Sequence, residues 1–96
     1  MSDAQTPAFD ARETVEITLA FPITVDGRKI DKVTMRRPKL RDTRAARKVT
    51  KDQFEAGVWM LATLCDLPPE VLDEMDDIDA ARLQAQYDSF RGQPAE

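Results

Sequence analysis

The strongest constraint on the fold is a strict alternation of apolar and polar residues that leads into an Asp-Gly turn. Between Val15 and Val25 every second residue is apolar, and the residues between them are polar, small or proline. A period of two is the pattern of a β-strand with one buried face. Asp26-Gly27 follows directly, and this dipeptide favours the type I′ turn, whose two central residues both need positive φ. The sequence therefore predicts a β-hairpin over residues 15–37.

The second strand of this hairpin cannot keep a simple register. If Asp26-Gly27 is a two-residue turn, Ile23 faces Ile30, but the same phase turns the next apolar residues away from the buried face. One extra residue near Asp31-Lys32 would restore the phase, so we predict a β-bulge or irregularity there. Pro22 has no N–H to donate and also indicates an edge or an irregularity. The expected pairs beyond the bulge are Val33 with Phe21 and Met35 with Leu19.

Helical patterns replace strand patterns after Pro38. We expect Asp42 to cap a short basic helix over residues 42–48. Thr50 and Gln53 have the spacing of a capping box and predict a second helix over residues 51–65. The apolar face of this second helix recurs at helical spacing and comprises Phe54, Val58, Leu61 and Cys65.

Two consecutive prolines separate this helix from the C-terminal part. Pro69 can be the first residue of a short helix over residues 69–75. Asp76 then caps a last helix over residues 77–91, with Asp79 in its first turn and Gly92 as its C-cap. The expected fold class is α+β: an N-terminal β-hairpin followed by a small bundle of three to four helices in one domain, residues 14–91. Residues 1–13 and 92–96 lack periodicity, so we expect a flexible arm and a flexible tail.

Composition argues against an enzyme. The chain has no histidine and a single cysteine, so neither a Ser–His–Asp nor a Cys–His site can be built, and no intrachain disulfide can form. We expect Cys65 to be a buried structural thiol, and we expect no cofactor and no metal. No stretch is apolar enough to span a membrane, and residues 1–8 lack the features of a secretory signal, so we expect a cytoplasmic location.

Charge is distributed unevenly along the chain. Eleven of the 14 Lys and Arg residues lie between Arg28 and Lys51, a stretch with only two Asp. This stretch can be a solvated face, a protein-binding surface or a nucleic-acid-binding surface. The pI of about 4.8 and the lack of interleaved aromatics disfavour nucleic acid. Its candidate contact residues are Arg36, Arg37, Arg41, Arg44, Arg47 and Lys48.

Acidic residues gather farther along, between Asp66 and Asp79, where there are seven acids and no base. An EF-hand loop needs a fixed ligand pattern with a central Gly, which this segment lacks. We interpret most of these acids as caps and solvated helix residues, and a partner-binding face is the alternative. Trp59 and Met60 lie near the edge of the predicted apolar stripe. Core packing and an interface both stay open for Trp59, because Trp is enriched at interface hot spots.

Three stretches, read in order, resemble a known family. They are ITLAFPITVDGRKI at 17–30, VTMRRPK at 33–39 before a basic helix, and LCDLPPEVLDEMDDID at 64–79 before a final helix ending at Phe90. Their order is similar to that of the tail assembly chaperones of Mu-like and related phages and prophages. In that family a strand pair ends in a leucine–arginine–x–proline phrase, here Met35-Arg36-Arg37-Pro38. An aspartate–x–x–aspartate phrase, here Asp76-Asp77-Ile78-Asp79, then opens the last helix. Met35 stands where leucine is usual, and Asp77 stands where proline is expected.

The resemblance covers residues 15–90 and implies a non-enzymatic function. Such proteins are thought to bind the tape measure protein, keep it soluble and help tail tube subunits assemble around it. They are made in the host cytoplasm and are absent from the finished virion. A helical, partly apolar partner needs exposed apolar or groove surface. For that surface we nominate Trp59, Met60 and the neighbouring helix faces, with the basic stretch steering acidic partners.

Two other classes of protein compete with this interpretation. One is a nucleic-acid-binding regulator that uses residues 36–51, and it predicts steeply salt-dependent binding to DNA or RNA. The other is a structural head–tail connector, which would be found in purified virions. A homo-oligomer is compatible with all three, because the hairpin's apolar face must be covered by the helices or by another copy of the chain.

Overall fold

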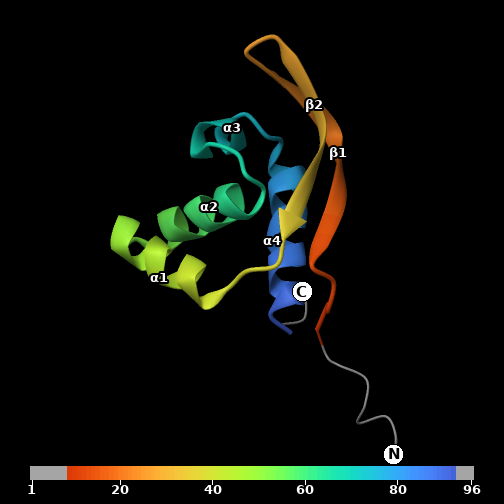
Figure 1. Cartoon of the computed structure of the whole chain (residues 1–96). Coiled ribbons are helices and arrows are strands. Elements are labelled where there is room, and N and C mark those ends of the chain that lie inside the picture. The colour runs from red at the N-terminus through yellow and green to blue at the C-terminus, as the bar shows by residue number, and fades with distance from the viewer. Residues whose placement is uncertain (1–8, 93–96) are drawn as a thin grey trace, which may run out of the picture.

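The structure is a computed structural model that describes residues 9–92. It confirms the expected α+β class, with an antiparallel β-hairpin followed by four helices (Figure 1). The helices gather on one side of the hairpin, and the hairpin turn projects beyond them (Figure 1). In chain order the elements are β1 (Thr14–Val25), β2 (Arg28–Arg36), α1 (Leu40–Val49), α2 (Gln53–Leu64), α3 (Pro69–Asp73) and α4 (Asp77–Phe90).

The hairpin turn forms at Asp26-Gly27, as the sequence predicts. Asp26 has φ of 51° and Gly27 has φ of 77°, which are the left-handed values that a type I′ turn needs. Val25 pairs with Arg28 across the turn. Ile23 pairs with Ile30, which confirms the predicted register next to the turn.

The predicted irregularity exists, but it lies on the other strand. Thr18 pairs with Lys32 and Ile23 pairs with Ile30, so residues 19–22 of β1 face the single residue Asp31 of β2. An irregularity beside Asp31 is therefore confirmed, but the expectation that β2 carries the extra residue was wrong, because the extra residues are in β1. The pairs beyond the irregularity are consequently Val33 with Ile17 and Met35 with Val15, instead of Val33 with Phe21 and Met35 with Leu19.

A buried carboxylate on α4 explains why β1 carries the irregularity. The backbone N–H groups of Ala20 and Phe21 donate hydrogen bonds to Asp79, over 2.8 and 3.0 Å. These two N–H groups therefore have partners outside the sheet, and Pro22 has no N–H that needs one. Phe21, which strict alternation would have buried, is 55% exposed as a result.

The core lies between the hairpin and the helices. Met35 of β2, Leu64 of α2 and Leu83 of α4 are fully buried. α4 contacts β1 and α2 contacts β2, so the helices cover one face of the two-stranded sheet. The other face carries exposed polar side chains, including an ion pair of 3.7 Å between Lys32 and Glu16. The hairpin contributes to the core through Val15, Ile17, Leu19, Ile23, Val33 and Met35.

The first two helices begin at positions that differ from the predicted caps. α1 begins at Leu40, and the carboxylate of Asp42 accepts a hydrogen bond from the backbone N–H of Lys39 over 2.8 Å. α2 begins after Asp52, whose side chain accepts from the N–H of Glu55 over 2.9 Å. The Thr50 hydroxyl instead accepts from the N–H of Asp52, so it is not the cap of α2.

This start places the residues of α2 differently from the prediction. Phe54 falls in the first turn and is 75% exposed, so its predicted position on the core face was wrong. Leu61 and Cys65 are buried as predicted. Met60, which was expected off the main face, is 5% exposed and belongs to the core. Burial in this apolar environment raises the pKa of the Cys65 thiol to about 11, consistent with the predicted structural thiol.

The C-terminal helices follow the predicted signals closely. Pro69 is the first residue of α3, and the Asp76 carboxylate caps α4 by accepting from the N–H of Ile78 over 3.0 Å. Gly92 follows α4 with φ of 80°. Most of the predicted arm (residues 1–13) and tail (residues 92–96) lies outside the described residues. Among residues 9–92, no helix combines the length and the apolar character needed to cross a bilayer.

Candidate functional site

Arg36, the first of the predicted contact residues, is bound within the molecule. Its guanidinium donates two hydrogen bonds to the carboxylate of Asp42, over 2.9 and 2.8 Å. These bonds lower the pKa of Asp42 despite its burial, and they raise the pKa of Arg36. Because Asp42 also bonds the N–H of Lys39, the pair joins the end of β2 to the start of α1.

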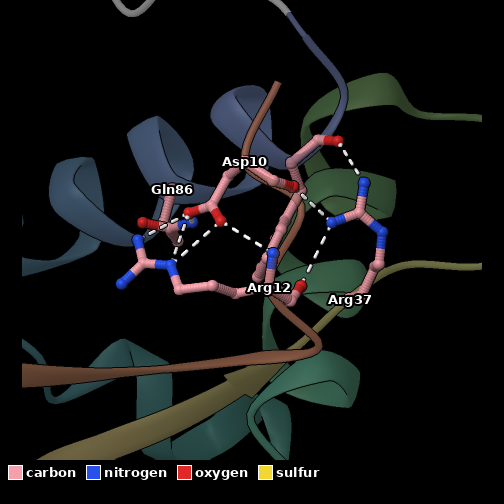
Figure 2. Close-up of polar contacts among 5 residues, drawn as sticks. Asp10, Arg12, Arg37 and Gln86 are labelled. Atoms are coloured by element: carbon pink, nitrogen blue, oxygen red, sulfur yellow. Dashed lines mark hydrogen bonds and ion pairs between the residues drawn. The ribbon is translucent and has the colours of Figure 1, made fainter. Parts of the chain in front are cut away.

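Arg37 holds the N-terminal segment against the end of α4. Its guanidinium donates to the carbonyl oxygens of Asp10, Arg12 and Phe90, the last over 3.0 Å (Figure 2). The guanidinium also lies over the rings of Phe9 and Phe90, 5.5 and 5.3 Å from their centroids. Arg37 therefore binds carbonyl groups and aromatic rings of its own chain.

The carboxylate of Asp10 completes this contact. It accepts hydrogen bonds from the Arg12 guanidinium and from the Gln86 amide of α4, the latter over 2.9 Å (Figure 2). The hydrogen bonds from Arg12 and Gln86 hold the pKa of Asp10 well below its ordinary value. The N–H of Asp10 donates to the carbonyl of Ser89 over 2.9 Å. Residues 9–13 thus lie along the C-terminal end of α4.

The basic residues of α1 form the exposed part of the predicted basic stretch. Their side chains are exposed, and none makes an ion pair or a side-chain hydrogen bond within residues 9–92. They remain candidates for contact with a partner. These residues, which we call the α1 basic face, are Arg41, Arg44, Arg47 and Lys48.

Trp59 and Met60, the predicted apolar contacts, lie at different depths. Met60 is buried in the core between the helices. Trp59 is half-buried and packs against the core, so part of its side chain stays at the surface. A role for either residue in partner binding stays a prediction.

Two open grooves flank α2. The first, between α1, α2 and α4, has a volume of about 740 Å³ and is lined mainly by polar and basic side chains, including Arg47, Lys51 and Arg91. The second, between α2, α3 and α4, has a volume of about 700 Å³. Both volumes are in the range of ligand and peptide sites. Gln53, Gly57 and Gln84 line both grooves.

The second groove, which we call the acidic groove, combines an apolar lining with acidic residues. Its charged lining residues are Glu55, Asp73 and Asp77, with no Lys or Arg among them. None of the three makes an ion pair in the part of the chain that the structure describes. The apolar side chains that line it are Phe54, Val58, Leu61, Leu72, Met75, Ala80 and Ala81.

Asp79 differs in burial from the other acidic residues of its segment. Its side chain is fully buried, whereas the six other acids between Asp66 and Asp77 are exposed. Burial alone would raise the pKa of Asp79, but hydrogen bonds from Ala20 and Phe21, with the charge and hydrogen bond of Arg82, bring it below the ordinary value. The interpretation of most of these acids as caps and solvated residues did not predict this role. The residue in the sequence that could have indicated this role was Pro22, because a proline in a strand marks a place where the regular pairing with the neighbouring strand is interrupted.

The acidic groove itself was not predicted from the sequence. The apolar spacing of α2 placed Phe54 on the core face, and Gly57 was not among the predicted site residues. A glycine in the middle of a helix lowers the stability of that helix relative to alanine. Gly57 was therefore the residue in the sequence that could have indicated a functional surface on α2.

Comparison with known proteins identifies the family. A family model described as phage tail assembly chaperone proteins, E, or 41 or 14, matches residues 16–92. A search of curated proteins and a search of solved structures each found no significant match. The match covers both strands and all four helices apart from the first two residues of β1. The chain therefore belongs to this family of phage tail assembly chaperones.

Proposed function

We propose that this chaperone binds the tape measure protein, keeps it soluble and assists assembly of tail tube subunits around it. The observation that carries the proposal is the apolar groove beside α2, together with Phe54, which is exposed at that groove. A carrier of a long helical protein needs exposed apolar surface of this kind. The α1 basic face is available to steer acidic segments of the same partner.

Co-expression with the tape measure protein of the same phage tests the proposal. We expect the two chains to co-purify, and we expect the tape measure protein to be soluble only when the chaperone is present. A tape measure protein that is equally soluble alone, and that does not co-purify, would contradict the proposal. A spectator protein of similar size and pI, expressed in place of the chaperone, controls for a general effect of co-expression.

The proposal also places the chain in the host cytoplasm during assembly and not in the mature virion. Mass spectrometry of purified virions checks this, because a structural head–tail connector would be recovered in stoichiometric amounts. Recovery of the chain at several copies per virion would favour the connector.

A nucleic-acid-binding regulator is the second candidate, because the α1 basic face has no acidic partner within residues 9–92. Four phosphate contacts would make log K fall with log salt with a slope of roughly −3 to −4. We expect no such binding at physiological salt, since the net charge of the chain is −4. A salt titration with DNA and RNA measures it.

A further inference from the structure

We propose that the acidic groove is the binding site of a partner helix whose apolar stripe is flanked by Lys and Arg. The inference rests on the proposed function and adds to it the place of binding and the chemistry of the bound segment. Of the two grooves beside α2, this one has the apolar lining that an amphipathic helix needs, whereas the groove against α1 is lined mainly by polar and basic side chains.

The negative charge of the acidic groove favours a partner helix that carries Lys or Arg. The groove carries Glu55, Asp73 and Asp77 and no basic residue, and Asp76 is exposed next to Asp77. A helix with acidic flanks would be repelled there, whereas Lys or Arg beside its apolar stripe would meet three carboxylates. Because these carboxylates make no ion pair within residues 9–92, a partner need not displace an internal contact to reach them.

Gly57 supplies an independent observation. It lies in the middle of α2, where glycine costs helix stability relative to alanine. Nothing within the described chain requires glycine there, since a Cβ added to Gly57 meets no atom within 4 Å and its φ is not positive. Gly57 lines the acidic groove, as Ala80 and Ala81 of α4 do, and it also borders the groove against α1. This allows the backbone of a partner helix to approach α2 closely, as small residues do at other helix contacts.

The experiment uses the full chain and peptides of about 25 residues that tile the tape measure protein. Fluorescence anisotropy on the tightest-binding peptide, at low ionic strength, compares the wild-type chain with four variants. The first replaces the three groove acids by amides, Glu55→Gln, Asp73→Asn and Asp77→Asn. The second is a matched control with the same change in net charge outside the groove, Asp66→Asn, Glu70→Gln and Glu74→Gln. The third is Gly57→Met, which adds a side chain to the groove lining, and the fourth is its control, Thr34→Met on the outer face of the hairpin.

We expect the binding peptides to carry Lys or Arg on both sides of an apolar stripe. The three groove amides should weaken peptide binding by about tenfold and make it less dependent on salt. The three control amides should weaken binding by less than about twofold. Gly57→Met should weaken binding at least as much as the groove amides, while Thr34→Met leaves it unchanged.

The outcomes separate the inference from the proposed function. If the wild-type chain neither co-purifies with the tape measure protein nor binds any peptide, both fail. If it co-purifies but the groove variants bind as well as their controls, or the binding peptides have acidic flanks, the inference is overturned and the chaperone function stands. Because Met is a good helix former and the space at Gly57 is open, we expect Gly57→Met to keep the fold, and circular dichroism checks this.

Discussion

The Oδ1 atom of Asp79, in the first turn of α4, lies 2.8 Å from the backbone nitrogen of Ala20 in the irregular part of β1. The second carboxylate oxygen accepts from the N–H of Phe21, so one side chain satisfies two donors that the sheet leaves without partners. An amide can accept at only one of these positions, because its NH₂ group is a donor.

Asp79→Asn should therefore lower the melting temperature by roughly 5–10 °C, and Asp79→Ala should lower it further. Thermal unfolding followed by circular dichroism measures the effect. Asp77→Asn is the matched control, since Asp77 lies in the same turn but is exposed, and it should shift the melting temperature by less than about 2 °C. Equal effects of the two changes would argue against the role assigned to Asp79.

Acidic pH should lower the stability of the folded chain, whereas changes of pH around neutrality should leave it unchanged. Asp10, Asp42 and Asp79 all have pKa values below the ordinary 3.8 in the folded chain. The unfolded chain therefore binds more protons than the folded chain as the pH falls below about 5, and stability falls with it. Above this range stability should be flat to about pH 8, because the chain has no histidine. Melting temperatures from pH 2.5 to 8 check both parts, and a transition centred near pH 6.5 would contradict them.

An arginine that is paired within the molecule and one that is not should contribute differently to the free energy of unfolding. Arg36→Ala leaves the buried carboxylate of Asp42 without its bidentate partner and should cost about 1–2 kcal/mol, a value kept low because Arg36 is itself about one-third exposed. Arg44→Ala on the α1 basic face should change stability by less than about 0.5 kcal/mol. Urea unfolding of both variants tests the contrast.

Arg37→Ala should release residues 9–13 from α4 while leaving the rest of the fold in place. Three carbonyl oxygens and two aromatic rings lose the same guanidinium. Hydrogen exchange should then show the amide of Asp10, which is bound to the carbonyl of Ser89, exchanging about tenfold faster or more. Arg44→Ala is the control, and an unchanged Asp10 amide in Arg37→Ala would refute the prediction.

Gly57→Ala should stabilise the folded chain by about 0.5–1 kcal/mol. Alanine has the higher helix propensity, and its Cβ would enter open space. A loss of stability in urea unfolding would show that Gly57 is required within the chain, and would weaken its use as a marker of partner approach.

Local signals in the sequence predicted most of the fold. The Asp26-Gly27 turn, the Pro69 start of α3 and the Asp76 cap of α4 each depend on one or two neighbouring residues, and all three are present. The shift at the start of α2 has an equally local reason, because Thr50 and Asp52 are both capable caps and only one can be used.

The main error in the hairpin comes from a contact that is distant in sequence. The side of the hairpin irregularity depends on Asp79, which lies more than 50 residues away, so the pattern of β1 and β2 alone could not assign it. Arg36 and Arg37 form part of a basic run in the sequence, yet their partners come from Asp42, the N-terminal segment and α4. The sequence therefore predicted where charge accumulates, but not which charges have partners within the molecule.

The link from Asp79 to β1 also bears on how the chain folds during synthesis. The hairpin leaves the ribosome first, but the carboxylate that satisfies Ala20 and Phe21 follows 59 and 58 residues later. Until α4 has been translated, the N–H groups of Ala20 and Phe21 lack this partner, so we expect the register of β1 against β2 to be less firmly fixed. We therefore expect the last helix to fix the register of the first strand, and a nascent chain that stops before α4 to hold a hairpin whose register is not yet set.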